Sequence, residues 1–205
     1  RDLVRSRGLG DVYKRQPYTY AHTDITVVDD RLANVISFEQ RKSINEPLYR
    51  GQIYIDMENN ALLRVDFEVN PQYIEQAAGM FVERKSRNLR ITPQKVAYTV
   101  SYKQWNGTYY INHIRGDLHF KIKKRRQLFN TNILHTWFEM VTCKIDTANV
   151  NRFSRIESLP TRTVFSDTHF NYDEGFWGDF NVILPEDKLN EAISRITSKI
   201  EETNY

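Results

Sequence analysis

The sequence predicts a mainly β (α+β) fold, a curved antiparallel sheet or half-barrel with one or two packed helices, including a C-terminal helix. Twelve Tyr and eleven Phe residues stand against eight Gly and six Pro, a composition that favours strands over disorder. Several segments alternate apolar and polar side chains with a period of two, and short polar turns separate them. Near the end of the chain the apolar spacing changes to that of an amphipathic helix.

The first sixteen residues differ from the rest. Residues 6–16, SRGLGDVYKRQ, resemble a translated sequencing adapter, so the native fold is expected to begin after residue 16. Residues 17–205 are then expected to form a single β-rich domain, the C-terminal part of a longer protein. The first sixteen residues hold five basic and two acidic side chains, which accounts for the whole net charge of +3. The remainder is therefore near neutral, which weakens a whole-chain case for nucleic-acid binding.

The clearest strand signal opens at Gly51. Residues 52–57 and 63–69 alternate apolar and polar side chains on either side of the turn residues 58–60. This pattern predicts a hairpin with one solvated face.

A helix is predicted directly after this hairpin. Asn70 has the chemistry of a helix cap, and Pro71 suits the first helical position. The helix is expected to continue over 72–85, with Gly79 weakening its middle. The residues expected on its buried side are Tyr73, Ile74, Ala77 and Phe81.

A second, longer hairpin follows. Residues 95–103 alternate, Asn106-Gly107 is a strong tight-turn signal, and residues 110–123 form the return strand. Gly116 in mid-strand predicts a bend or bulge. Val96, Tyr98, Val100 and Tyr102 share one face of the first strand, and Tyr110, Ile114, Leu118, Phe120 and Ile122 share one face of the second.

A further strand is predicted from Leu134 to Ile145, with Trp137, Val141, Cys143 and Ile145 on one face. This pattern predicts a buried, inert thiol for Cys143, the only cysteine. Residues 146–167 show no regular alternation of apolar and polar side chains, which predicts a connecting segment. The acidic and aromatic segment 173–179 is expected to anchor the C-terminal helix, whose apolar positions are Leu189, Ala192, Ile193, Ile196 and Ile200.

Three residues that could take part in catalysis lie on one predicted strand. His113, Asp117 and His119 share a face, and two imidazoles with a carboxylate can bind zinc or transfer protons. Residues four to six apart on a strand lie roughly 13–20 Å apart, so only Asp117 and His119 are close, and a solvated strand face is preferred. His135 and Glu139 lack the HExxH signature. We therefore predict no catalytic residue, no metal site and no cofactor.

One concentrated basic run covers 121–126, with Lys121, Lys123, Lys124, Arg125 and Arg126 as its cations. It could contact phosphates of nucleic acid or an anionic membrane surface. The preferred interpretation is a strand end whose charges discourage edge pairing and maintain solubility.

Two segments of the sequence are similar to segments of a known protein family. GQIYID at 51–56 with ALLRVDF at 61–67, and FWGDFNVILPE at 176–186, resemble the C-terminal module of Bacteroidota carboxypeptidase-like regulatory domain-containing proteins. The resemblance spans about 18–200 and implies a cell-envelope setting without peptidase activity. The hairpin, helix and long strands are also similar, more loosely, to outer-membrane lipoprotein carrier half-barrels.

The sequence thus predicts a non-catalytic cell-envelope binding or scaffolding domain, periplasmic or outer-membrane associated. Its partner would be an envelope protein or a hydrophobic ligand, with nucleic acid disfavoured and a peripheral membrane contact open. The alternatives are a hydrolase or metal-dependent enzyme using the His113/Asp117/His119 face, and binding of nucleic acid or an anionic surface through 121–126. The residues expected to bind the hydrophobic ligand are Tyr98, Tyr102, Tyr110, Phe120 and Trp137.

Overall fold

The computed structural model describes residues 17–82, 86–125, 131–148 and 150–155, together with 158, 160 and 163. Contacts divide the chain into two units, Arg1–Thr142 and Cys143–Tyr205, and the sheet belongs to the first. The predicted C-terminal helix, the segment 173–179 and the adapter-like residues 6–16 lie outside the described residues.

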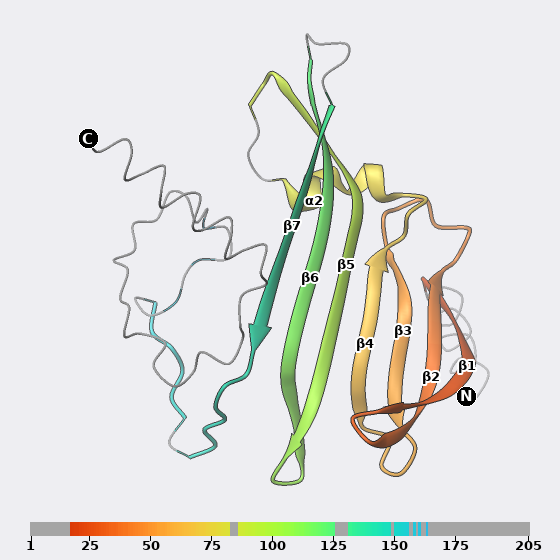
Figure 1. Cartoon of the computed structure of the whole chain (residues 1–205), viewed down its shortest axis with the longest axis vertical. Coiled ribbons are helices and arrows are strands. Elements are labelled where there is room, and N and C mark those ends of the chain that lie inside the picture. Colours follow the sequence, from red (N-terminus) through yellow and green to blue (C-terminus); the bar gives the residue numbers. More distant parts are fainter. Residues whose placement is uncertain are drawn as a thin grey trace, which may run out of the picture. The chain divides into compact units, whose positions relative to one another are not determined.

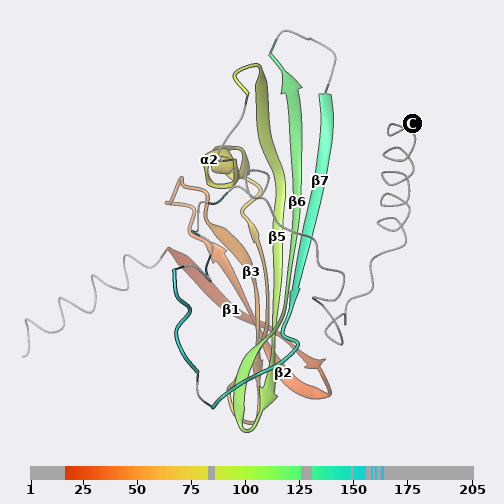
Figure 2. The same cartoon turned by 90° about the vertical axis from the view of Figure 1, so that its left-hand side faces the viewer.

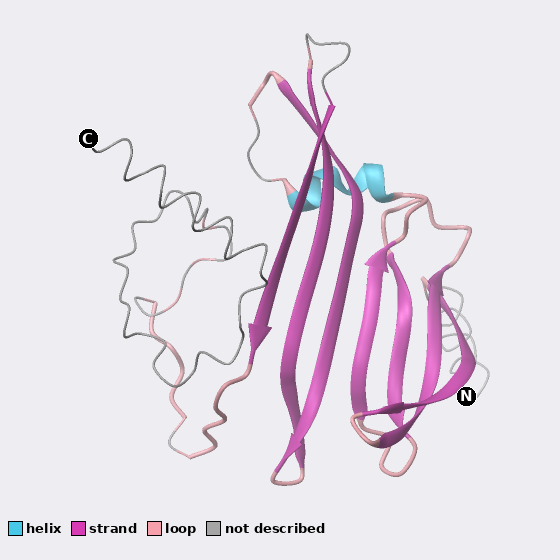
Figure 3. Ribbon diagram, viewed as in Figure 1, coloured by secondary structure: helices cyan, strands magenta, loops and turns pink. Residues whose placement is uncertain are grey.

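Seven antiparallel strands form one sheet, and their order in space is their order in the chain (Figure 1). The sheet is curved and unclosed, with β1 and β7 at its two edges, which confirms the predicted fold class (Figure 3). Strands that follow one another in the chain are also neighbours in the sheet, and antiparallel neighbours can be joined by short connections. The strands are β1 Tyr18–Val28, β2 Arg31–Gln40, β3 Tyr49–Asp56, β4 Leu62–Val69, β5 Leu89–Trp105, β6 Thr108–Lys124 and β7 Thr131–Val141.

Both predicted hairpins are confirmed. β3 pairs with β4, and β5 pairs with β6 through the turn at Asn106 and Gly107, whose φ angles are 48° and 81°. Positive φ at both central residues is the geometry that an Asn-Gly turn adopts between twisted strands.

The bulge predicted at Gly116 is wrong. The β5–β6 register shifts instead between Ser101 and Tyr102, which leaves Asn112 of β6 as the extra residue, and again between Pro93 and Lys95. Gly116 pairs regularly with Tyr98 and Phe138, and the ring of Phe138 lies over it. The missing side chain therefore makes room for an aromatic ring rather than for a bulge.

The predicted helix is shorter than 72–85. A 3₁₀ turn, η1 Ile74–Ala77, continues into the α-helical turn α2 Ala78–Phe81, and Val82 is already extended. Asn70 accepts a hydrogen bond from the backbone N–H of Gln72, but it does not cap the helix. The first helical turn begins at Ile74, Tyr73 is at its N-cap position and no side chain caps it, so the predicted cap at Asn70 and first helical position at Pro71 are wrong. Seen from the side, this helical segment lies against one face of the sheet (Figure 2). Ile74 and Ala77 are buried there against Val69 and Val96, with Tyr49, Phe81, Tyr98 and Leu118 packed around them.

Strand β7 ends at Val141, four residues before the predicted Ile145, and Cys143 is exposed rather than buried. The last pair of the β6–β7 ladder joins His113 to Val141. One further backbone hydrogen bond follows this pair, from the N–H of Thr142 to the carbonyl of Asn112 at 2.9 Å. Cys143 lies beyond it and outside the strand, so strand parity no longer sets its environment.

The register gives the sheet two different faces. On the apolar face one cross-strand line, the aromatic row, runs from β2 to β7 and is paired residue by residue. The opposite, polar face carries most of the charged residues of β3 to β7. The aromatic row consists of Phe38, Gly51, Phe67, Tyr98, Gly116 and Phe138.

Candidate functional site

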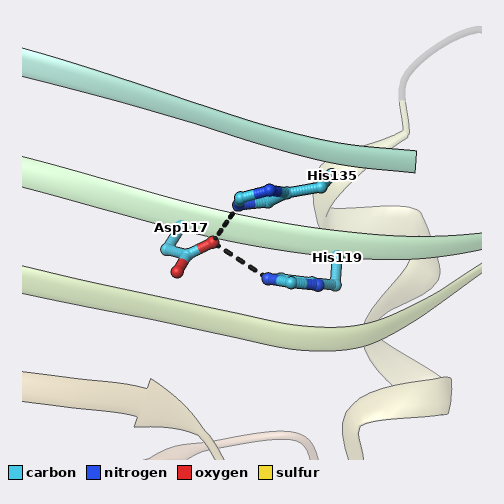
Figure 4. A group of neighbouring side chains, drawn as sticks. All are labelled: Asp117, His119 and His135. Carbon is cyan, nitrogen blue, oxygen red and sulfur yellow. Dashed lines mark hydrogen bonds and ion pairs between the residues drawn. The ribbon is translucent and has the colours of Figure 1, made fainter. Parts of the chain in front are cut away.

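The polar face brings together one carboxylate and two imidazoles from β6 and β7. Asp117 and His119 are two residues apart on β6, so both side chains project from the same face. The antiparallel register places His135 of β7 directly opposite His119, and Trp137 opposite Asp117. Figure 4 shows both rings directed at the same carboxylate oxygen. We call Asp117, His119 and His135 the His–Asp cluster.

The distances within the His–Asp cluster are those of hydrogen bonds. Nε2 of His135 lies 2.7 Å from Oδ1 of Asp117, and Nε2 of His119 lies 3.1 Å from the same oxygen. The two imidazole rings are stacked, with centroids 4.2 Å apart and planes 24° from parallel. The side chains are 31% (Asp117), 34% (His119) and 49% (His135) exposed, so solvent reaches all three.

The charge state of Asp117 is set by opposing effects. Burial raises the pKa of this carboxyl, but the hydrogen bond from His135 and the charges of His135, His119 and Lys95 lower it by more. The net pKa of Asp117 therefore lies below its ordinary value, and the side chain is a carboxylate at neutral pH.

His113 does not join the His–Asp cluster, although it shares its face. Its Nε2 lies 3.8 Å from Oε1 of Glu139, and the same oxygen accepts a 2.6 Å hydrogen bond from Arg115. The guanidinium of Arg115 also lies over the ring of Trp137, 5.5 Å from its centroid. The predicted set His113, Asp117 and His119 thus separates into two groups along β6.

The sequence pattern relates His135 to Glu139 on its own strand. In the structure the contacts of His135 are instead across the sheet to β6. The pairing of residues 119 and 135 would have placed His135 beside His119. The sequence between 124 and 131 carries no tight-turn signature that would predict this β6–β7 register.

A shallow, open groove of about 490 Å³ lies on β2 to β5, lined mainly by polar-face residues of those strands. Four members of the aromatic row also line it, namely Phe38, Gly51, Phe67 and Tyr98. Arg50 and Glu68 form an ion pair of 2.7 Å within it, and Thr99 donates a 2.8 Å hydrogen bond to Asp66. Lys95 lines the groove and is paired in register with His119. The groove therefore borders the His–Asp cluster.

The five residues expected to bind a hydrophobic ligand do not share a face. Tyr98 and Tyr102 lie on the apolar face, as does Phe120, which is buried at 6% exposure. Tyr110 lies on the polar face because the bulge at Asn112 reverses the parity that the sequence predicted. Trp137 lies there too, opposite Asp117.

The aromatic row contains members that the sequence analysis did not select, namely Phe38, Phe67 and Phe138. The ring of Phe67 is stacked on Tyr98 at 5.2 Å, and Tyr49 meets Phe67 edge-on at 5.4 Å. The rings of Tyr98 and Phe138 lie 6.4 Å apart, across Gly116. Cross-strand pairing, which one sequence does not reveal, is what makes these rings neighbours.

The basic run does not form one surface. Lys121 and Lys123 project from the polar face, Lys124 from the apolar face, and Arg125 is in the turn that follows. Arg126 lies outside the described residues.

No helix in the described part of the chain is long and apolar enough to cross a membrane. The chain matches no protein-family model, no curated protein and no solved structure. Its function is therefore inferred from its own residues and their geometry, and the resemblance to the Bacteroidota module stays a prediction.

Proposed function

We propose that this protein is a non-catalytic binding domain of the cell envelope that holds a hydrophobic ligand or partner segment on its apolar face. The observation that carries the proposal is the aromatic row, which crosses six strands and remains partly exposed among the described residues.

The exposure of this face is uneven. The helical segment 74–81 covers the end near Val69 and Val96, which are 1% and 0% exposed. Phe38, Phe67 and Tyr98 are only half-buried, and Phe138 is 43% exposed. An apolar surface of this kind, exposed among the described residues, is typical of a binding site.

The chemistry of the aromatic row suits binding rather than catalysis. Its one ionisable group is the hydroxyl of Tyr98, and burial, followed by the charge of Tyr49, raises the pKa of that hydroxyl above its ordinary value. The hydroxyl therefore stays protonated at neutral pH and is a poor general base. The aromatic rings offer a flat surface for an acyl chain or for apolar side chains of a partner.

The cell-envelope setting of the proposal comes from the resemblance of segments 51–67 and 176–186 to an envelope module. A periplasmic or outer-membrane-associated location is proposed on that ground.

The test is a titration of the full chain with a fluorescent fatty acid, using two matched variants on β7. Phe138→Glu places a charge on the apolar face, and Ile133→Glu places the same charge on the polar face. Ile133 is the more exposed of the two, at 69% against 43%, so a non-specific effect would be larger there. We expect saturable uptake that Phe138→Glu weakens and Ile133→Glu leaves unchanged. Absence of saturable uptake, or equal loss in both variants, would refute the binding face.

A further inference from the structure

We propose that the His–Asp cluster is a binding site for a divalent metal ion of the zinc class, held by Nε2 of His119, Nε2 of His135 and a carboxylate oxygen of Asp117. The site lies on the polar face, opposite the surface to which the binding function is assigned, and is independent of that function.

The spacing of the donor atoms supports the proposal. Zinc binds imidazole nitrogen and carboxylate oxygen at about 2.0–2.2 Å, so two donors of a tetrahedral site lie about 3.4 Å apart. In the His–Asp cluster the two nitrogen-to-oxygen distances are 2.7 and 3.1 Å, and all candidate ligand atoms lie within 4.8 Å of one another. Small side-chain rotations, without movement of the strands, would place the three donors around one ion.

The strands also fix the ligands on a rigid frame. His119 and His135 occupy opposed positions on adjacent strands, and Asp117 is two residues from His119. The stacked rings already direct both Nε2 atoms toward Oδ1 of Asp117 (Figure 4). Ligands held on strands lose little conformational freedom when an ion binds.

The positive charge of Lys95 and the types of donor atom limit which metal ions the His–Asp cluster can bind. Lys95 is paired with His119 and its charge acts on Asp117, so it opposes any cation at the site. With one carboxylate, the cluster suits Ca²⁺ or Mg²⁺ poorly, because these ions depend on several oxygen ligands. Two imidazoles suit zinc and its neighbours among the transition metals.

The partial exposure of all three ligands leaves room for water or another ligand to complete the coordination. Three protein ligands with an open position is the arrangement that zinc adopts where it binds exchangeable ligands, whereas closed structural sites use four protein ligands.

The proposal is tested by titrating the tag-free, chelator-treated full chain with Co²⁺ followed by absorbance, and then displacing Co²⁺ with Zn²⁺. A tag must be absent because a polyhistidine segment would itself bind both ions. The ligand variants are Asp117→Asn, His119→Gln and His135→Gln. His113→Gln is the matched control, since His113 lies on the same strand and face but contacts Glu139. Cys143→Ser controls for the exposed thiol.

We expect one equivalent of metal with a Co²⁺ spectrum of low coordination number, displaced by Zn²⁺ and unaffected by excess Ca²⁺. Each ligand variant should weaken binding by more than about tenfold, since loss even of an outer partner of a ligand costs 10- to 100-fold. The two controls should bind like the wild type.

The proposal is overturned if the wild type shows no saturable binding, or if the ligand variants bind like the wild type. His135 is about half exposed on an edge strand, so His135→Gln is expected to fold, and far-UV circular dichroism verifies this. Phe138→Glu supplies a further check, because it should leave metal binding intact while weakening fatty-acid uptake.

Discussion

Two glycines in the aromatic row differ in what surrounds them. A side chain at Gly51 would meet the backbone oxygen of Asp66 and lie 2.7 Å from Cα of Phe67 on the neighbouring strand. The three atoms nearest to a side chain at Gly116 would all belong to the ring of Phe138, which is partly exposed. The backbone of a hydrogen-bonded strand pair cannot move away from an added side chain, whereas an exposed aromatic ring can rotate to make room for it. Glycine is therefore required at position 51 and favoured at position 116.

This difference gives the first prediction. Gly51→Ala should lower the free energy of unfolding by about 1–3 kcal/mol, the usual cost of overpacking, and by more than Gly116→Ala does. Gly79→Ala is the control, because nothing lies within 4 Å of that position and alanine favours a helix by about 1 kcal/mol. Urea denaturation followed by circular dichroism measures all three. Equal stability of the Gly51 and Gly79 variants would contradict the close approach of β3 to β4.

A second residue-scale prediction concerns Asp56, whose side chain is fully buried. Nε of Arg31 donates to one of its oxygens, and the backbone N–H of Glu58 donates to the other at 2.8 Å. The hydrogen bond from Arg31 lowers the pKa of this carboxyl and outweighs its burial, which acts in the opposite direction. The ionised form therefore stabilises the fold above the ordinary pKa of 3.8, and this contribution is lost as the pH falls through the lower, folded-state pKa.

Asp56→Asn should accordingly destabilise the protein at pH 7 and make its stability less dependent on pH below about 4. Glu39→Gln, which alters an exposed carboxylate on β2, should change neither quantity appreciably. Thermal unfolding at several pH values gives the comparison. A wild type and an Asp56→Asn variant that lose stability in parallel as the pH falls would exclude this role for the Arg31–Asp56 pair.

At the scale of the elements, the strength of the periodic signal decided what could be predicted. β3 to β6 follow a clean alternation, and the turn at Asn106 and Gly107 marks their longest hairpin. The pattern of residues 18–40, which contain β1 and β2, predicts no element. A register shift between His22 and Asp24 reverses the parity of β1. Apolar residues on both faces of β2, such as Val35 and Ile36, leave it without a period of two.

The same limit applies to the functional site. The sequence placed Asp117 and His119 together, because two residues on one strand have a fixed relation. It could not add His135, nor assign Tyr110 and Trp137 to the correct face, because these depend on a register and a bulge that local pattern does not encode.

The helical segment 74–81 should contribute strongly to the stability of the sheet. Ile74 is 5% exposed against Val69 and Val96, whereas Met80 is 55% exposed. Ile74→Ala should cost about 2–4 kcal/mol through lost burial and a residual cavity, and Met80→Ala less than about 0.5 kcal/mol. Chemical denaturation measures both. If the two variants were equally stable, the helical segment would not be part of the core.

At the scale of the whole sheet, alternation along each strand places two kinds of surface back to back. The apolar face offers aromatic rings to a hydrophobic partner, and the polar face offers the His–Asp cluster and the groove beside it. Because successive residues point to opposite faces, a substitution can alter one surface while its neighbour in sequence stays unchanged. The edge strand β7 contributes to both surfaces through Phe138 and His135.

The most direct test of the binding face is an NMR titration of the isoleucine-methyl-labelled protein with a fatty acid. Ile53 and Ile114 lie on the apolar face beside the aromatic row, and Ile133 lies on the polar face. We predict that the methyl signals of Ile53 and Ile114 shift along one saturable curve while that of Ile133 stays in place. Shifts of equal size at all three methyls, or no shift at any of them, would contradict a ligand-binding apolar face.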